Sequence, residues 1–128
     1  MILVDTSVWI DHLHQAEPGL QRALEADEVA THPLIIAELA LGSIARRAEI
    51  LALLTNLWRV PSLTHQEMLG YVEQAQLWGR GLSIVDAHLL GSVKLAPDSE
   101  LWTRDKRLRT AARVAQVALF DEGNEQKG

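Results

Sequence analysis

Several residue types are absent or scarce in this chain, and each scarcity excludes a class of protein. There is no cysteine, so disulfides and thiolate metal sites are impossible. One phenylalanine and one tyrosine argue against a single-strand binder built on many stacking aromatic rings. The net charge of −5 argues against binding nucleic acid by overall attraction, although a local basic patch stays compatible with it. No uncharged apolar run approaches the roughly 18 residues of a membrane span.

The length and composition indicate one globular domain. At 128 residues the chain can bury a core, and 48% hydrophobic with 23% charged residues is ordinary for a soluble protein. We expect a single domain over residues 1–121 and a flexible tail over residues 122–128, where polar and charged residues dominate. The first residues lack the basic region and long apolar stretch of a signal peptide. A cytoplasmic protein without a membrane segment is therefore expected.

Short apolar segments alternate with helical patterns along the chain. The run Ile2-Leu3-Val4 is continuously apolar, as in a strand buried on both faces. Pro33 suits a first helical position, and Thr64 and Ser83 each begin a capping-box pattern. Strands are expected over residues 2–4, 28–31, 58–60, 100–103 and 117–120, and helices over residues 6–14, 18–26, 33–42, 44–57, 64–78, 83–95 and 106–113. This order predicts an α/β fold with helices flanking a mostly parallel sheet.

Two carboxylates follow expected strands. Asp5 ends the first apolar run, and Asp105 follows the segment Leu101-Trp102-Thr103. In open parallel sheets, ligands bind outside the carboxyl ends of the strands. Both acids are therefore expected at the edge where a ligand would bind.

Two further carboxylates interrupt apolar helical segments. Glu38 is the only charge within residues 34–41, and Asp86 is the only charge within residues 82–87. Helical spacing places Glu38 on one face with Leu34 and Ile35, so it is expected to lean inward. An acid beside buried surface must be paired, neutralised or bound to a cation. If the fold gathers all four acids, a divalent metal is the simplest common partner.

Each acid also has an ordinary structural explanation. Asp5 and Asp105 could each cap the helix that follows. Asp86 is the third helical residue after the Ser83 cap, where an acid stabilises the helix. Glu38 could instead form a buried ion pair or lean toward solvent at an edge. The four together favour one shared site over four separate explanations.

The donor chemistry points to a particular kind of metal. Carboxylate oxygens suit Mg²⁺ or Mn²⁺ rather than Zn²⁺, and one or two such ions can serve phosphodiester hydrolysis. Without metal, the four charges would repel one another, and some pKa values would rise. Thr103, Ser7 and Thr6 offer hydroxyls that could orient a carboxylate, although helix capping is favoured for Thr6. The five histidines are expected not to be ligands, and the four tryptophans are expected in the core or at interfaces.

A basic segment lies beside the last acid. Arg104, Lys106, Arg107 and Arg109 surround Asp105 in sequence. Basic side chains next to an acidic metal site suit a phosphate backbone, so these residues are candidate RNA contacts. The alternative is a solvated helix face whose charges offset nearby acids.

Four segments carry a recognisable series of motifs. They are Val4-Asp5-Thr6-Ser7-Val8-Trp9-Ile10, Ala37-Glu38-Leu39-Ala40-Leu41-Gly42, Leu82-Ser83-Ile84-Val85-Asp86-Ala87 and Leu101-Trp102-Thr103-Arg104-Asp105. In this order they resemble a PIN-domain ribonuclease, and more closely the VapC-type toxin of bacterial and archaeal toxin–antitoxin pairs. The resemblance spans residues 2–108, nearly the whole chain.

The resemblance implies a site and an activity. It makes Asp5, Glu38, Asp86 and Asp105 metal-binding acids and Thr103 a supporting hydroxyl. It implies a PIN-like three-layer sandwich that cleaves RNA endonucleolytically with Mg²⁺ or Mn²⁺, leaving a 5′-phosphate and a 3′-hydroxyl. The implied partners are a cognate antitoxin and a second copy in a homodimer.

Two positions depart from the family pattern. Residues 93–99 lack the glycine that often precedes the final strand, and Pro97-Asp98 is expected to supply the turn. Leu108 stands where an aromatic residue is common. Asp98 is close enough in sequence to compete with Asp105 as the fourth acid, but the Thr-x-Asp spacing favours Asp105.

Two other functions remain open at this point. A phosphoacceptor receiver domain also has strand-end acids and about this length. It normally has an acidic pair after the first strand, whereas here only Asp5 follows that strand. A catalytically silent PIN domain acting as an RNA-binding scaffold is the second alternative. The complete set of four acids argues against that scaffold.

Overall fold

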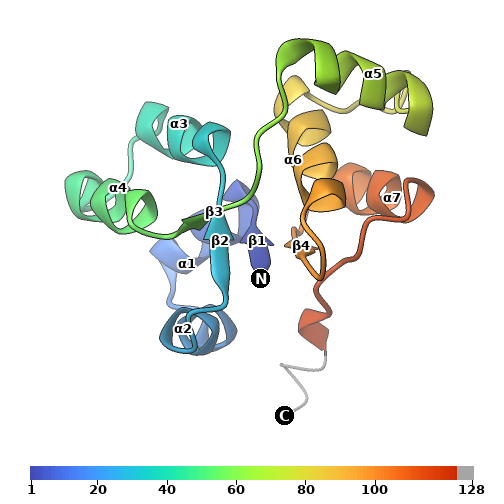
Figure 1. Cartoon of the computed structure of the whole chain (residues 1–128). Helices are drawn as coiled ribbons and strands as arrows, with labels where there is room; N and C mark the ends of the chain where they lie inside the picture. Colours follow the sequence, from blue (N-terminus) through green and yellow to red (C-terminus); the bar gives the residue numbers. More distant parts are fainter. Residues whose placement is uncertain (124–128) are drawn as a thin grey trace.

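A four-stranded parallel sheet forms the centre of the molecule (Figure 1). The structure is a computed structural model that describes residues 1–123. The strands are β1 (Ile2–Val4), β2 (Val29–Thr31), β3 (Trp58–Arg59) and β4 (Glu100–Trp102), in the spatial order β3-β2-β1-β4. All three strand pairs are parallel, with Leu3 opposite Ala30 on one side and Leu101 on the other. The expected α/β fold is confirmed.

Helices cover both sides of this sheet. They are α1 (Thr6–His14), α2 (Pro18–Glu25), α3 (Pro33–Leu41), α4 (Arg47–Thr55), α5 (His65–Ala75), α6 (Ile84–Leu95) and α7 (Lys106–Val114). Figure 1 shows α1 to α4 grouped on one side of the sheet and α5 to α7 on the other. No helix within residues 1–123 is long and apolar enough to cross a membrane.

The core forms where the sheet meets these helices. Leu3, Val4 and Leu101 are completely buried in the central strands, and Trp9 and Trp102 pack beside them. Burial on both faces explains why the strand sequences are continuously apolar instead of alternating.

The expected elements differ from the observed ones mainly at their ends. The fourth helix begins at Arg47 because Arg46 has a left-handed backbone conformation, and the fifth ends at Ala75 because Gln76 does. The strand expected over residues 117–120 is wrong as an extended element. Only an isolated parallel bridge joins Leu119 to Leu101 there.

The parallel arrangement separates two edges of the sheet. Asp5 follows β1 and Asp105 lies just after β4, so both lie at the edge formed by the strands' carboxyl ends. Asp98 precedes β4, and its carbonyl accepts a hydrogen bond from the amino group of Met1 at 3.4 Å. Asp98 therefore lies at the opposite edge. Its left-handed φ of 60° supplies the turn for which many sequences use glycine.

The start of the expected tail is attached to the fold. A carboxylate oxygen of Glu122 accepts a hydrogen bond from the Trp102 indole at 2.9 Å, and the carboxylate also pairs with Arg104. Residues 124–128 of the expected tail lie outside the described residues.

Candidate functional site

Asp5 is the most deeply placed of the four acids. Its side chain is only 7% exposed, and its Oδ2 accepts hydrogen bonds from Thr103 Oγ1 at 2.7 Å and Ser7 Oγ at 2.9 Å. It precedes α1 but makes no side-chain capping bond. The capping explanation is therefore wrong for Asp5. Two hydroxyl donors compensate its burial instead.

The same hydroxyls connect the ends of β1 and β4. Ser7 Oγ accepts from the Arg104 backbone N–H at 3.1 Å, and Thr103 Oγ1 accepts from the Asp105 backbone N–H at 3.1 Å. The supporting role expected for Thr103 thus has a geometric basis. This hydrogen-bond network holds Asp5 and the backbone of residues 104–105 in a fixed position relative to each other.

Asp105 caps α7 and remains exposed. Its Oδ1 accepts from the backbone N–H groups of Arg107 and Leu108 at 2.9 and 3.1 Å. The capping explanation is right for this residue. It does not exclude a second role, because these bonds use one of the two carboxylate oxygens.

Asp86 also has a structural role and a perturbed charge. Ser83 and Asp86 form a complete capping box, with both hydrogen bonds at 3.0 Å. Burial raises the pKa of Asp86, and the charges of Asp105 and Asp5 raise it further, against the opposing effect of the Ser83 hydrogen bonds. The direction of this shift agrees with the mutual repulsion expected among the acids.

Glu38 does not lean into the core. It is exposed, and its Oε1 accepts a hydrogen bond from Thr6 Oγ1 at 2.7 Å. The inward orientation expected for Glu38 is wrong, because α3 buries Ile35 and Leu39 and turns Glu38 toward α1. The capping role favoured for Thr6 is wrong as well.

The four carboxylates share a pattern of hydrogen bonding. Each has one oxygen held by a donor, and no hydrogen bond from residues 1–123 reaches its other oxygen. As the side chains lie, no three histidine, aspartate or glutamate residues in this range are close enough to hold a metal ion. As the side chains lie, the acids of residues 1–123 therefore form no closed cage, and each leaves one carboxylate oxygen open.

Within residues 1–123, some side chains of the basic segment pair with carboxylates and others do not. Arg104 donates to Asp11 at 2.8 Å, Glu17 at 2.9 Å and Glu122 at 2.7 Å. These carboxylates raise the pKa of Arg104 despite its partial burial. Arg104 is thus engaged by three protein carboxylates, so it is less available to a phosphate than an unpaired cation would be.

The other basic candidates differ in how many contacts they make with residues 1–123. Arg109 Nη1 donates to the Thr103 carbonyl at 3.1 Å, which ties it to the end of β4. Lys106 and Arg107 are exposed at the start of α7 and form no salt bridge with residues 1–123. They remain the better candidates for a phosphate.

Two histidines near the strand ends have structural surroundings that the sequence did not reveal. His32 Nδ1 accepts from the Leu34 backbone N–H at 3.0 Å and so caps α3. Its ring centroid lies 6.2 Å from that of His88. Burial, together with the His88 charge, lowers the pKa of His32 to about 4. It is therefore neutral near neutral pH.

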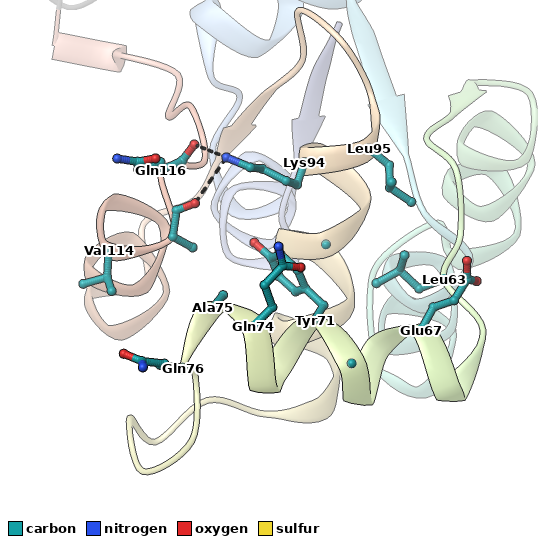
Figure 2. A pocket seen from close by; sticks show the side chains of 13 residues that line it. Leu63, Glu67, Tyr71, Gln74, Ala75, Gln76, Lys94, Leu95, Val114 and Gln116 are labelled. Carbon is teal, nitrogen blue, oxygen red and sulfur yellow. Dashed lines mark hydrogen bonds between the residues drawn. The ribbon is translucent and has the colours of Figure 1, made fainter.

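A large cavity lies away from the acids. It measures about 770 Å³ and opens between α5, α6 and the end of α7, as Figure 2 shows. Lys94 there donates to the carbonyls of Ala115 and Gln116 at 3.4 and 3.1 Å (Figure 2). None of the four acids lines this cavity.

Comparison with known proteins identifies the family. Residues 2–114 match the PIN domain. The chain belongs to the PIN-domain family. This PIN domain is 56% identical over 122 residues to proteins named Ribonuclease VapC32 from two Mycobacterium tuberculosis strains, CDC 1551 / Oshkosh and ATCC 25618 / H37Rv. Each alignment covers 95% of this chain and 98% of the relative.

A solved structure agrees on the fold. The crystal structure of PAE2754 from Pyrobaculum aerophilum resembles this PIN domain with a TM-score of 0.56 and 19% sequence identity. The match covers 90% of this chain and 95% of that one. At this identity the likeness concerns the fold alone. The PIN match over residues 2–114 sets aside the receiver-domain alternative. The 56% identity to proteins named Ribonuclease VapC32 confirms the expected VapC-type resemblance.

Proposed function

We propose that this PIN domain is a Mg²⁺- or Mn²⁺-dependent endoribonuclease, the toxin of a toxin–antitoxin pair. One observation carries the proposal. Thr103, directly after β4, donates a hydrogen bond to Asp5, directly after β1, and the charges of Asp105 and Asp5 both raise the pKa of Asp86. The identity to proteins named ribonuclease supports the same reaction class.

The donor set fits a hard divalent cation. Asp5, Glu38, Asp86 and Asp105 would hold it through the oxygens that no described residue occupies. Mg²⁺ binds through one or two carboxylates and keeps several waters, which suits an open group of acids better than a closed cage. When bound, such an ion supplies charge neutralisation and Lewis acidity at a phosphate.

The protein's own residues supply orientation and substrate binding. Thr103 and Ser7 fix the Asp5 carboxylate, and Thr6 fixes that of Glu38. Lys106 and Arg107 lie beside Asp105 and would bind the RNA backbone, because free cationic side chains attract phosphates. Glu38 is exposed, so it should contribute from the solvent side.

Partners follow from the VapC-type resemblance. We propose a cognate antitoxin that restrains the activity and a homodimer as the assembled form. RNA and a co-produced antitoxin would be met in the cytoplasm, which is where we propose that the protein acts. The nuclease domain is proposed to span residues 1–121.

The test is RNA cleavage by purified variants with added Mn²⁺. Loss of an outer-shell partner of a metal costs about 10–100-fold, so Asp5→Asn and Asp86→Asn should each lose at least about 100-fold. The matched control is Asp98→Asn, at the opposite edge of the sheet, where asparagine tolerates the left-handed backbone. The control should cleave like the unchanged protein, and mapped products should carry 5′-phosphates.

Two results would overturn the proposal. Undiminished cleavage by both Asp5→Asn and Asp86→Asn would exclude the acids from the mechanism. An unchanged protein that binds RNA without cutting it, with Mg²⁺ or Mn²⁺ present, would instead be a silent PIN scaffold. Circular dichroism of each variant ensures that lost activity is not lost folding.

A further inference from the structure

The loop between α5 and α6, residues 76–83, exposes an unusual amount of apolar surface beside the acids. Trp78 in this loop is 60% exposed, and Ile84, at the start of α6, is 68% exposed. Ile84 lies two residues before Asp86. Trp78 does not lie in the core, so of the two settings expected for the tryptophans only an interface is compatible with its exposure. Exposed aromatic residues next to a site are candidates for ligand contact.

The loop holds Trp78 in a fixed setting. Leu77 is buried, so it anchors the chain directly before Trp78. Arg80 Nε donates to the Gln76 carbonyl at 3.0 Å and closes the turn. Gly81 has a left-handed φ of 74°, and a methyl group added there would meet the Arg107 side chain at 3.1 Å. The loop therefore packs closely against α7, and little ordering would be required when Trp78 meets a ligand.

Two hollows flank the loop. One, of about 310 Å³, is mainly apolar, and Trp78 and Ile84 line it together with Ser83, the capping partner of Asp86. The other, of about 350 Å³, is basic and is lined by Arg80, Lys106 and Arg107. Arg107 also donates its backbone N–H to Asp105. Each hollow thus touches an element that positions one of the acids.

Within residues 1–123, no carboxylate forms a salt bridge with the cations of the basic hollow. No acidic residue lines it, and Arg80, Lys106 and Arg107 form no salt bridge within residues 1–123. This contrasts with Arg104, which is held by three carboxylates. In a chain of net charge −5, three uncompensated cations in one place indicate a polyanionic ligand. An apolar aromatic surface alongside them favours a ligand that carries bases as well as phosphates.

We propose that residues 76–83 form an RNA-binding element in which Trp78 stacks on an unpaired base near the cleaved bond. Arg80, Lys106 and Arg107 bind the adjacent phosphates. This inference rests on the proposed ribonuclease function and adds how single-stranded RNA is seated. An acidic protein segment would match the cations but would gain little from a planar ring, so RNA is the occupant that the two hollows favour together.

The experiment measures RNA binding without cleavage. Fluorescence anisotropy of a short labelled single-stranded RNA of mixed sequence, in EDTA, gives the Kd for the unchanged protein and for Trp78→Ala. Stacking is lost in the variant, so its Kd should rise about 5- to 150-fold. Trp78→Phe retains an aromatic face and should recover most of the affinity. Arg107→Gln should lower the slope of log K against log salt by about one.

The matched control is Trp58→Ala. Trp58 is 50% exposed on β3 and lies beside Met1, at the edge opposite the acids. Its removal should leave the Kd unchanged. Thermal unfolding of all variants shows whether each one folds, and the salt slope of Arg107→Gln provides a second measurement that does not depend on Trp78.

The outcomes separate this inference from the proposed function. If the unchanged protein cleaves RNA with Mn²⁺ but Trp78→Ala binds as tightly as it does, the RNA-binding element is refuted and the ribonuclease stands. If binding weakens equally in Trp78→Ala and Trp58→Ala, the stacking role is also refuted. If the unchanged protein neither binds nor cleaves RNA, the proposed function itself fails. Affinity for acidic peptides that depends on Trp78, without RNA binding, would assign the surface to a protein partner.

Discussion

Thr103 donates a hydrogen bond of 2.7 Å to Asp5, across 98 residues of sequence. The bond joins the ends of two neighbouring strands and leaves Oδ1 of Asp5 without a hydrogen bond from residues 1–123. It is buried, so the donor and the acceptor depend on one another. The orientation of the deepest acid in the site therefore depends on a residue that is distant in the sequence but adjacent in the fold.

Thr103→Val should destabilise the protein and impair cleavage. The substitution keeps the shape but removes a buried donor to Asp5 and an acceptor for the Asp105 N–H. Leaving these groups unpaired should lower the free energy of unfolding by about 1–3 kcal/mol, measured by urea titration. Thr31→Val is the control, because the buried Thr31 hydroxyl has no partner within residues 1–123. A loss as large in Thr31→Val as in Thr103→Val would contradict this account.

Asp86→Asn should stabilise the protein near neutral pH. Burial first, and then the charges of Asp105 and Asp5, raise the pKa of Asp86 in the folded state above its ordinary value of 3.8. The folded state then binds protons more tightly than the unfolded state, so stability falls as pH rises between the two pKa values. An asparagine side chain cannot ionise, so the advantage of the variant should appear above that window and vanish below it. Urea titrations at about pH 3 and pH 7 test the sign, and a variant less stable at pH 7 would reverse it.

Arg104→Gln should weaken the attachment of the C-terminal segment to α1. The partly buried guanidinium bonds to Asp11, Glu17 and Glu122, and charged hydrogen bonds of this kind contribute about 1.5–3 kcal/mol. We expect a loss of about 2 kcal/mol near neutral pH. Arg46→Gln, which removes an exposed ion pair at 3.9 Å, should change stability by less than about 0.5 kcal/mol.

The pH dependence of the Arg104 effect has a definite sign. The hydrogen bond from Arg104 lowers the pKa of Glu17, so the stabilisation is present above the ordinary carboxyl pKa and is lost as pH falls through the lowered one. The difference between Arg104→Gln and the unchanged protein should therefore shrink in acid. A difference that is constant across this range would show that packing of the arginine stem, and not its charge, stabilises the fold.

Mn²⁺ should stabilise the folded protein only when the acids are intact. A ligand that binds the folded state adds about 2.7 kcal/mol at a concentration of one hundred times its Kd. Thermal unfolding with and without Mn²⁺ should show a higher Tm for the unchanged protein and for Asp98→Asn. Asp5→Asn should show little or no increase. An equal increase in Asp5→Asn would place the ion elsewhere.

Local patterns predicted most of the secondary structure and the helix-capping contacts of Asp86 and Asp105. The capping boxes at Thr64 and Ser83 form as expected, because their partners lie only three residues apart. Asp105 caps α7 for the same reason. Helix α4 begins later than expected, after Arg46, and α5 ends earlier than expected, before Gln76. Both residues have left-handed backbone conformations, which arginine and glutamine do not predict.

The sequence by itself determined that strands and helices alternate, that two acids follow strands and that two interrupt apolar helical segments. These features depend on contacts within a few residues and on the period of the hydrophobic pattern. The tertiary structure decided that Asp98 lies at the sheet edge opposite the other acids and that Glu38 is exposed. It also decided that Arg104 pairs with three carboxylates and that Trp78 is exposed to solvent. Each of these depends on sheet order and on contacts between distant segments, such as Thr103 with Asp5 and Arg104 with Glu17. Because strand order and helix docking are set by the packing of the whole core, no local pattern could have revealed them.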